Sequence, residues 1–475
     1  MHCYTTCSQD AFDHEIVAFR RDERAEAGLV VCRPDRTFQR IVGFGGAFTE
    51  AAALVFAQMP PEMQDDFLVK CFGGTDSGDG ALGGNAYTIC RTHIQSCDFA
   101  LGNYSYVRPF DRSLNSFAIE RDKRLLLPFI QCGLAVNPRL ELLASPWSPP
   151  AFMKTNGRMN GGGRLRRSYY QAWARLLVRY VEAYAAEGVH IGRMSVQNEP
   201  MASQRWDSCL FSAEEEARFA AGYLRPAFDE AGLSSMRIFA WDHNTDRILD
   251  RIEATFASVG SRNGRKSDAE PVSGDALSAR DAFDGVAFHW YAGDHFEQVH
   301  AVAEAYPEKE LLFTEGCVEK SHDRAAESTQ ERKAEQYAHA VIGCLNAGAA
   351  GFIDWNLLLD ERGGPNHVRN YCEAPLMYDR AERELIVNRS FSYLGHFSRF
   401  VTPDSQRFLV SRFTDDIECS GFVRPDGRRV LVVLNRRGHA VHFAVAERPC
   451  IAPVEAPPHS ILTLVWDQGE VNPCL

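Results

Sequence analysis

The sequence has no long apolar run, no cluster of basic residues and no dense arrangement of cysteines. None of its apolar stretches approaches the roughly 18 residues that a membrane-spanning helix needs, so we expect no membrane span. Acidic residues outnumber basic ones by 63 to 51, and the formal net charge is −12. Since nucleic-acid-binding proteins need a basic surface, nucleic acid is not an expected partner.

The 14 cysteines are spread along the whole chain, without the short spacings of a disulfide scaffold. Cys3 and Cys7 have no second Cys/His pair with zinc-site spacing, so we expect no metal site there. The first residues show no cationic segment followed by an apolar one, which is the pattern of a secretory signal. These features predict reduced thiols and a cytoplasmic location.

Three familiar catalytic signatures are also missing. The segment GFGGAF does not match the GxGxxG turn of dinucleotide-binding folds. His243, His289 and His295 do not form an HExxH pair, so contacts to sugar or to other side chains are favoured over metal binding. None of the predicted strands ends in lysine, which argues against a Schiff-base aldolase.

The chain does contain a regular alternation of short strand-like runs and helix-period segments, from about residue 40 to about residue 395. Repeated βα units of this kind indicate a parallel sheet. Eight such units, within a chain of 475 residues that is 45% hydrophobic, predict a (β/α)₈ TIM barrel. The eight runs are IVGFGG, NAYTICR, LELLAS, GRMSVQNE, MRIFAWD, GVAFHWY, ELLFTEG and GFIDWN.

The last part of the chain changes character. Short strands follow one another closely after residue 396, and the PDG at 425–427 reads as a hairpin turn. GLVVCRP near the N-terminus resembles a strand of the same sheet. We therefore predict N-terminal strands in residues 1–38, a catalytic barrel in 39–395 and, in 396–475, an antiparallel β-sandwich that is completed by the N-terminal strands.

Two predicted barrel strands close with a glutamate, Glu199 in SVQNEP and Glu315 in FTEGC. An acid at a strand end is often a solvated residue or a helix cap. Two of them at the active rim of one barrel instead suit glycosidic bond hydrolysis, in which one carboxyl protonates the leaving oxygen and the other attacks carbon or activates water. Their mutual repulsion raises the pKa of one carboxyl, which divides the pair into an acid and an anion.

Other residues near the predicted strand ends complete this hypothesis. Arg91, at the end of the second strand, is either a cation that keeps a catalytic carboxylate ionised or a surface salt bridge. Asn198 offers a donor to a sugar hydroxyl. Aromatic residues at three strand ends predict a stacking surface for a pyranose, whereas Trp173 is expected in the core and Cys317 in packing. These rim aromatics are Trp147, Trp290, Tyr291 and Trp355.

The ordered set of segments resembles glycoside hydrolase family 30, on its acid β-glucosylceramidase-like branch. The segments are GFGGAFTEAAAL, SCDF, LLASPWSPPAFMKTNG, SVQNEP, AFHWY, FTEGC, DWNLLLDERGGPNHVRN and YLGHFSRF, in the family's order from about residue 30 to 470.

The resemblance implies a retaining β-glycosidase with a barrel and a β-sandwich, needing no metal or organic cofactor. It makes Glu199 the acid/base and Glu315 the nucleophile. It places Arg91, His289 and Tyr291 around the nucleophile. The residues that would hold the sugar are Asp98, Trp147, Asn198, Trp355 and Asn370.

The substrate is expected to be a small β-glycoside or a glycolipid, as in sphingolipid metabolism. β-Xylosidase, β-fucosidase and endo-β-1,6-glucanase activities of the same family remain open, as do transglycosylation and a non-catalytic carbohydrate-binding role. The oligomeric state is not indicated by the sequence.

Overall fold

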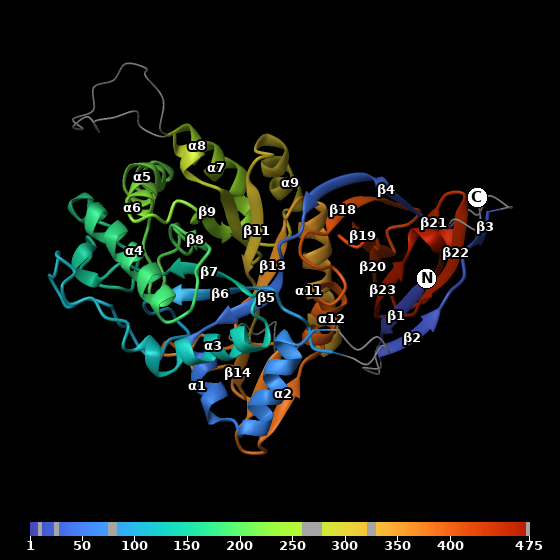
Figure 1. Cartoon of the computed structure of the whole chain (residues 1–475), viewed down its shortest axis with the longest axis horizontal. Helices are drawn as coiled ribbons and strands as arrows, with labels where there is room; N and C mark the ends of the chain where they lie inside the picture. The colour runs from blue at the N-terminus through green and yellow to red at the C-terminus, as the bar shows by residue number, and fades with distance from the viewer. Residues whose placement is uncertain (8–11, 23–27, 75–82, 259–277, 321–328, 472–475) are drawn as a thin grey trace.

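The computed structural model describes residues 1–7, 12–22, 28–74, 83–258, 278–320 and 329–471. Its two parts are a barrel and a β-sheet domain, joined along helices α11 (Gln330–Asn346) and α12 (Arg389–Ser398) (Figure 1). Strands from the two ends of the chain lie together in the sheet domain, where blue and red ribbons meet in Figure 1.

The eight predicted strands form a closed parallel barrel in chain order. All eight sequence runs contributed one strand each, which confirms the TIM-barrel prediction. The strands are β5 (Gly43–Phe48), β6 (Ile89–Ile94), β7 (Glu141–Pro146), β8 (Arg193–Ser195), β9 (Arg237–Asn244), β10 (Gly285–His289), β11 (Glu310–Glu315) and β13 (Gly351–Asp354).

Amphipathic helices cover the outside of the barrel and bury their apolar faces on the strands. The longer ones are α1 (Glu50–Gln58), α2 (Pro61–Phe72), α3 (Leu126–Val136), α4 (Tyr170–Ala186), α7 (Ile248–Ala257), α9 (Phe296–Ala305) and α11. Trp173 on α4 is completely buried, as expected for a core residue. Gly188, just beyond α4, has φ +78°, the left-handed conformation that glycine adopts readily after a helix.

One helical segment begins with a side-chain cap and is interrupted by a π-helical turn. Ser212 caps α5 (Ala213–Phe219) through a capping box with Glu215. The helix is then interrupted by a π-helical turn, η4 (Ala220–Leu224), before α6 (Arg225–Glu230). Pro226 lies in the first turn of α6, where a proline without a backbone N–H is tolerated.

The second domain is a ten-stranded sheet, antiparallel except between β4 and β21. One apolar cluster joins residues from the two halves of this sheet, such as Leu431, Phe443 and Leu464, so the halves pack face to face. Its strands are β1 (His2–Thr6), β2 (Phe12–Ile16), β3 (Arg20–Arg21), β4 (Leu29–Arg40), β18 (Gln406–Arg412), β19 (Ile417–Val423), β20 (Arg429–Asn435), β21 (Val441–Glu447), β22 (Cys450–Ala456) and β23 (Ser460–Trp466).

The two domains share a continuous packed interface. Residues of β20 and β23, such as Val432 and Ile461, belong to the same apolar cluster as the barrel helices. His396 on α12 is buried and bonds Thr6 of β1 at 2.8 Å and Thr463 of β23 at 2.9 Å. The sheet is therefore packed against the barrel.

Other expectations were only partly met. The hairpin at 425–427 is confirmed between β19 and β20. The domain boundaries at 38/39 and 395/396 stay predictions; β4 runs across the first and α12 across the second. Twelve cysteines of the described chain are free, but Cys450 is disulfide-bonded, so the expectation of reduced thiols is wrong there.

Candidate active site

The barrel interior is layered, and the layers follow from the two-residue period of its strands. One apolar layer fills the barrel with Ile89, Leu143, Phe239, Ala287, Leu312 and Ile353. Two residues further along each strand, the next inward side chain lies nearer the carboxyl end. On five of these strands that residue is Arg91, Ser145, His289, Thr314 or Trp355. The sequence thus places a polar layer directly above an apolar floor.

Strand β9 breaks this period and brings Asp242 into the polar layer. Two residues beyond Phe239, regular alternation would point the side chain of Trp241 into the barrel. The register between β9 and β10 instead shifts by one residue at this point. Trp241 and Asp242 both have positive φ, +75° and +52°. The bulge turns Trp241 outward, where its backbone N–H bonds Glu216 of α5, and turns the carboxylate of Asp242 inward.

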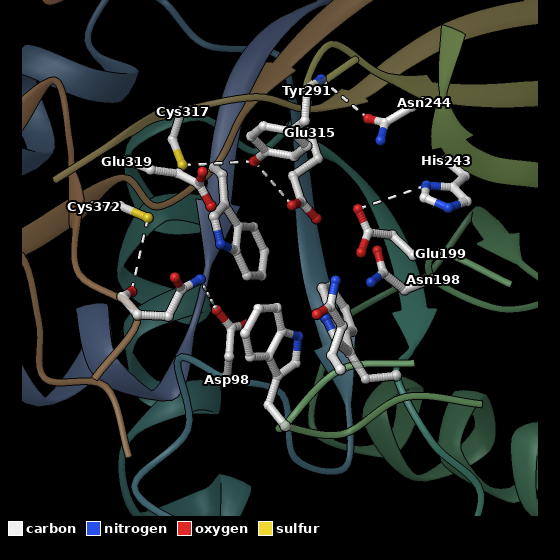
Figure 2. A pocket seen from close by; sticks show the side chains of 15 residues that line it. Asp98, Asn198, Glu199, His243, Asn244, Tyr291, Glu315, Cys317, Glu319 and Cys372 are labelled. Carbon is white, nitrogen blue, oxygen red and sulfur yellow. Dashed lines mark hydrogen bonds and ion pairs between the residues drawn. The ribbon is translucent and has the colours of Figure 1, made fainter. Parts of the chain in front are cut away.

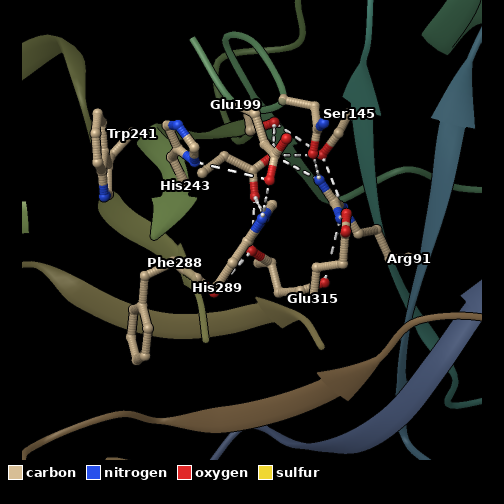
Figure 3. Close-up of polar contacts among 12 residues, drawn as sticks. Arg91, Ser145, Glu199, Trp241, His243, Phe288, His289 and Glu315 are labelled. Carbon is tan, nitrogen blue, oxygen red and sulfur yellow. Dashed lines mark hydrogen bonds and ion pairs between the residues drawn. The ribbon is translucent and has the colours of Figure 1, made fainter. Parts of the chain in front are cut away.

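The carboxylate of Asp242 is the hub of the site; Figure 3 shows several of its partners, including Arg91, Ser145 and His289. It is fully buried and accepts five hydrogen bonds, from Arg91 (2.7 Å), Ser145 (3.0 Å), Ser195 (2.6 Å), His289 (3.1 Å) and Thr314 (2.6 Å). Burial alone would raise the pKa of Asp242, but Arg91 and His289 outweigh it and hold that pKa well below its usual range. Asp242 is therefore a permanent anion.

Arg91 links this anion to both predicted catalytic segments. Its guanidinium donates to Glu315 Oε2 at 2.5 Å and to Asn198 Oδ1 at 2.8 Å. The residue lies within β6 rather than at its end, and it is completely buried. The alternative of a surface salt bridge is thus wrong, because the inward face of β6 leads into the barrel.

Glu199 lies beyond its strand rather than at its end. Strand β8 stops at Ser195, and the backbone N–H of Glu199 bonds the carbonyl of Asp242 at 2.9 Å. Glu199 has φ +48°, a left-handed conformation that turns its side chain into the barrel mouth. Its Oε1 lies 3.3 Å from His289 Nδ1 and 3.7 Å from His243 Nδ1.

Glu315 ends β11, as predicted, and faces Glu199. Besides Arg91, the hydroxyl of Tyr291 donates to its Oε1 at 3.0 Å. One carboxylate oxygen of Glu199 and one of Glu315 lie within 4.8 Å of each other, with a nitrogen of His289 in the same group.

The proton distribution in this cluster follows from its charges. Burial alone would lower the pKa of His289, but Glu315, Asp242 and Glu199 outweigh it and raise that pKa to about 9. Burial alone would raise the pKa of Glu199, but His289 and His243 lower it below its usual value. Burial raises the pKa of Glu315, with Glu199 and Asp242 adding to the rise against His289 and Arg91. In the free site the proton therefore lies on His289.

Because a protonated imidazole has no free lone pair, the group formed by Glu199, His289 and Glu315 favours proton sharing over metal coordination. The three side chains are close enough together to hold an ion, but two of them are already bonded to cationic or hydroxyl donors.

A pocket opens in front of the two glutamates (Figure 2). Trp147 and Trp355 stack at 5.2 Å between ring centroids and form an apolar wall. Opposite the glutamates, Asn370 donates to the carboxyl of Asp98 at 3.3 Å. Burial, together with the charge of Glu315, raises the pKa of Asp98 to about 8, so this carboxyl is neutral at lower pH.

All ten predicted site residues meet here. Eight line the pocket: Asp98, Trp147, Asn198, Glu199, Tyr291, Glu315, Trp355 and Asn370. Arg91 and His289 lie beneath it and bond the two glutamates. The prediction for Trp290 is wrong, because strand alternation turns it away from Tyr291 and packs it on Phe313 and Tyr337.

Several lining residues were missed by sequence reasoning. Gln204 and Trp206 come from the loop after β8, and Cys372 follows the barrel at strand β15 (Cys372–Glu373). Cys317 lines the pocket 3.5 Å from the Tyr291 hydroxyl rather than serving only in packing. The sequence contained a signal for Asp242: this acid follows the run MRIFAW directly, in the same way that Glu315 follows the run ELLFT.

Comparison with known proteins places the chain among glycosidases. The family model described as the glycosyl hydrolase family 30 TIM-barrel domain matches residues 41–401, and the family 30 β-sandwich domain matches residues 400–464. The chain is 32% identical to lysosomal acid glucosylceramidase from Mus musculus over 92% of this chain and 83% of that protein. It is 25% identical to an endo-1,6-β-D-glucanase from Neurospora crassa, over 87% and 82% respectively.

Solved structures agree. SrfJ from Salmonella typhimurium aligns with a TM-score of 0.89 and 40% identity, covering 98% of this chain and 100% of that one. The endo-β1,6-glucanase BT3312 aligns with a TM-score of 0.82 and 27% identity, over 98% and 99%. In the described part of the chain, no helix combines the length and the apolar character that crossing a membrane requires.

Removing the charge of Asp242 should destabilise the protein strongly. In Asp242→Asn, the buried cations of Arg91 and His289 lose their shared counter-ion, and breaking a buried pair in this way costs roughly 3–5 kcal/mol. Urea unfolding at pH 7 measures the loss. The matched control is Asp294→Asn, which removes a largely exposed carboxylate from an ion pair and should change the free energy of unfolding little. Equal effects of the two substitutions would contradict the hub role of Asp242.

Proposed function

The chain belongs to glycosyl hydrolase family 30 and is a retaining β-glycosidase, and we propose that Glu315 is its nucleophile and Glu199 its acid/base. One observation carries the pairing: oxygens of the two carboxylates lie within 4.8 Å of each other. Retaining enzymes hold the two groups about 5–5.5 Å apart, whereas inverting enzymes leave about 6.5–9.5 Å for a water molecule.

The partners of each glutamate support their separate roles. Glu315 accepts from Arg91, whose guanidinium stays charged at every relevant pH, and from Tyr291. A carboxylate fixed by such donors stays ionised for attack on carbon, even though burial, together with the neighbouring acids, raises its pKa. Glu199 instead contacts the imidazole of His289, which carries a proton that it can exchange. A group that must donate and accept a proton in turn is supported by a partner that can do the same.

The reaction then has two steps. Glu199 donates its proton to the glycosidic oxygen while an oxygen of Glu315 bonds the anomeric carbon, and the bond to the leaving group breaks. Glu199 next removes a proton from water, which attacks the same carbon and releases Glu315. Two inversions leave the β configuration retained.

For the sugar, we propose a β-linked glucose held between the Trp147–Trp355 wall and the polar group of Asp98 and Asn370. A glucosylceramidase and endo-1,6-glucanases among the relatives support glucose. Asn198, held by Arg91, has its amide directed into the pocket, where it would bond the 2-hydroxyl. A lipid leaving group, with a role in sphingolipid metabolism, and a cytoplasmic location stay predictions.

Glu315→Ala should lose at least about 10⁴-fold in kcat on 4-nitrophenyl β-glucoside, because no covalent intermediate can form. With 2,4-dinitrophenyl β-glucoside and azide, the variant should produce α-glucosyl azide, since azide attacks from the vacated side. Proton NMR of the product measures its configuration. Substantial hydrolysis without azide, or a β-azide, would assign the nucleophile elsewhere.

Glu199→Ala should depend strongly on the leaving group. Acid assistance is worth about 10²–10⁴-fold for poor leaving groups and little for activated ones. We therefore expect a large loss of kcat/KM on methyl or phenyl β-glucoside and a small one on the 2,4-dinitrophenyl substrate, measured under identical conditions. Azide should yield β-glucosyl azide here, the opposite anomer from Glu315→Ala. Equal losses on all substrates would contradict the acid role.

A further inference from the structure

The side chain of His289 contacts both Glu199 and the buried anion of Asp242 beneath the site. Its Nδ1 lies 3.3 Å from Glu199 Oε1, and its Nε2 lies 3.1 Å from Asp242 Oδ1. The imidazole is fully buried. Both ring nitrogens therefore face carboxylates, and only the doubly protonated ring satisfies both contacts by donation.

The groups around His289 come from every neighbouring strand of the polar layer. Asp242 and His243 follow from β9, Glu199 from the segment after β8 and Glu315 from β11. Arg91, on β6, pairs with Asp242 and Glu315. The three carboxylates favour an imidazolium, whereas the charge of Arg91 opposes it; His243, whose own pKa is lowered, is neutral. Since Arg91 is already paired with two of those carboxylates, the balance keeps the proton on His289, in agreement with its pKa of about 9.

Resting on the proposed function, we infer that His289 stores the catalytic proton and passes it to Glu199, with Asp242 holding the imidazole in place. In the free enzyme the N–H at Nδ1 of His289 donates to ionised Glu199. When the substrate is bound, the Nδ1 proton moves to Glu199, so one N–H bond breaks and one O–H bond forms; Glu199 then gives this proton to the glycosidic oxygen, which leaves His289 neutral and Glu199 ionised. When Glu199 later takes a proton from water, it returns one to Nδ1.

This role explains how Glu199 works as an acid although its own pKa is low. The states with the proton on His289 and with the proton on Glu199 have the same total number of protons. The fraction of enzyme that can protonate the substrate therefore stays constant until the pair loses its proton. That loss occurs near the pKa of His289, about 9, rather than in the carboxylic range.

The test is the alkaline limb of kcat/KM on phenyl β-glucoside, a substrate that needs acid assistance. In the wild-type enzyme the limb should lie near pH 9. Glutamine can still donate a hydrogen bond but cannot store a proton, so in His289→Gln the limb should fall by at least about two pH units, toward the pKa of a buried carboxyl. A residue with a merely structural role would lower the rate equally at every pH.

His243→Gln is the matched control, because His243 approaches the same oxygen of Glu199 at 3.7 Å but has a lowered pKa and is neutral. Its limb should stay at the wild-type position. A limb that moves in His243→Gln, or that stays unmoved in His289→Gln, would overturn the inference. If instead the wild-type enzyme released no retained sugar, the proposed function itself would fail, so the two failures are distinguishable.

A measurement on the wild-type protein covers the case in which His289→Gln does not fold. With ¹⁵N-labelled histidine, NMR should show one imidazole whose two nitrogens both stay protonated up to about pH 9, as its raised pKa requires. If every imidazole loses its proton below pH 7.5, which is about one unit above the ordinary histidine pKa, the inference is wrong.

Discussion

The active site depends on one buried anion that takes no part in bond breaking, the carboxylate of Asp242. Three hydroxyls and two cations converge on it from five other strands of the barrel. An uncompensated carboxylate could not stay ionised in this interior, His289 could not stay charged without it, and the permanently charged Arg91 would lose one of its two counter-ions. The charges of Asp242 and His289 therefore depend on their partners, and the barrel holds these groups at fixed distances.

From this hub the two glutamates receive different surroundings. Arg91 pairs with both Asp242 and Glu315 and keeps a fixed positive charge beside Glu315. His289 pairs with both Asp242 and Glu199 and carries a proton that it can exchange. The difference between a guanidinium and an imidazole thus separates an attacking carboxylate from a proton donor. The sugar pocket above, with its tryptophan wall and the neutral carboxyl of Asp98, adds recognition without adding charge.

Much of this arrangement was predictable from local patterns. Strand-like runs bounded by turns gave the barrel, and the glutamate that closes FTEG was correctly placed at the end of β11. Predictions failed where the strand period is broken. Glu199 lies beyond β8 in a left-handed conformation, and a bulge moved Asp242 inward. The five side chains that bond Asp242 come from five other strands, so no single segment of the sequence indicates that they meet. Trp290 was misplaced because two adjacent aromatic residues cannot both face the same side of a strand.

The central claim is that Glu315 forms a covalent bond to the sugar. The direct measurement is mass spectrometry of the enzyme after reaction with a 2-deoxy-2-fluoro-β-glucosyl fluoride, whose fluorine slows release of the intermediate. We predict one sugar per chain, attached to the peptide that contains Glu315 and lost again when an acceptor sugar is added. An enzyme that turns over β-glucosides but is never labelled, or is labelled at Glu199, would contradict the account.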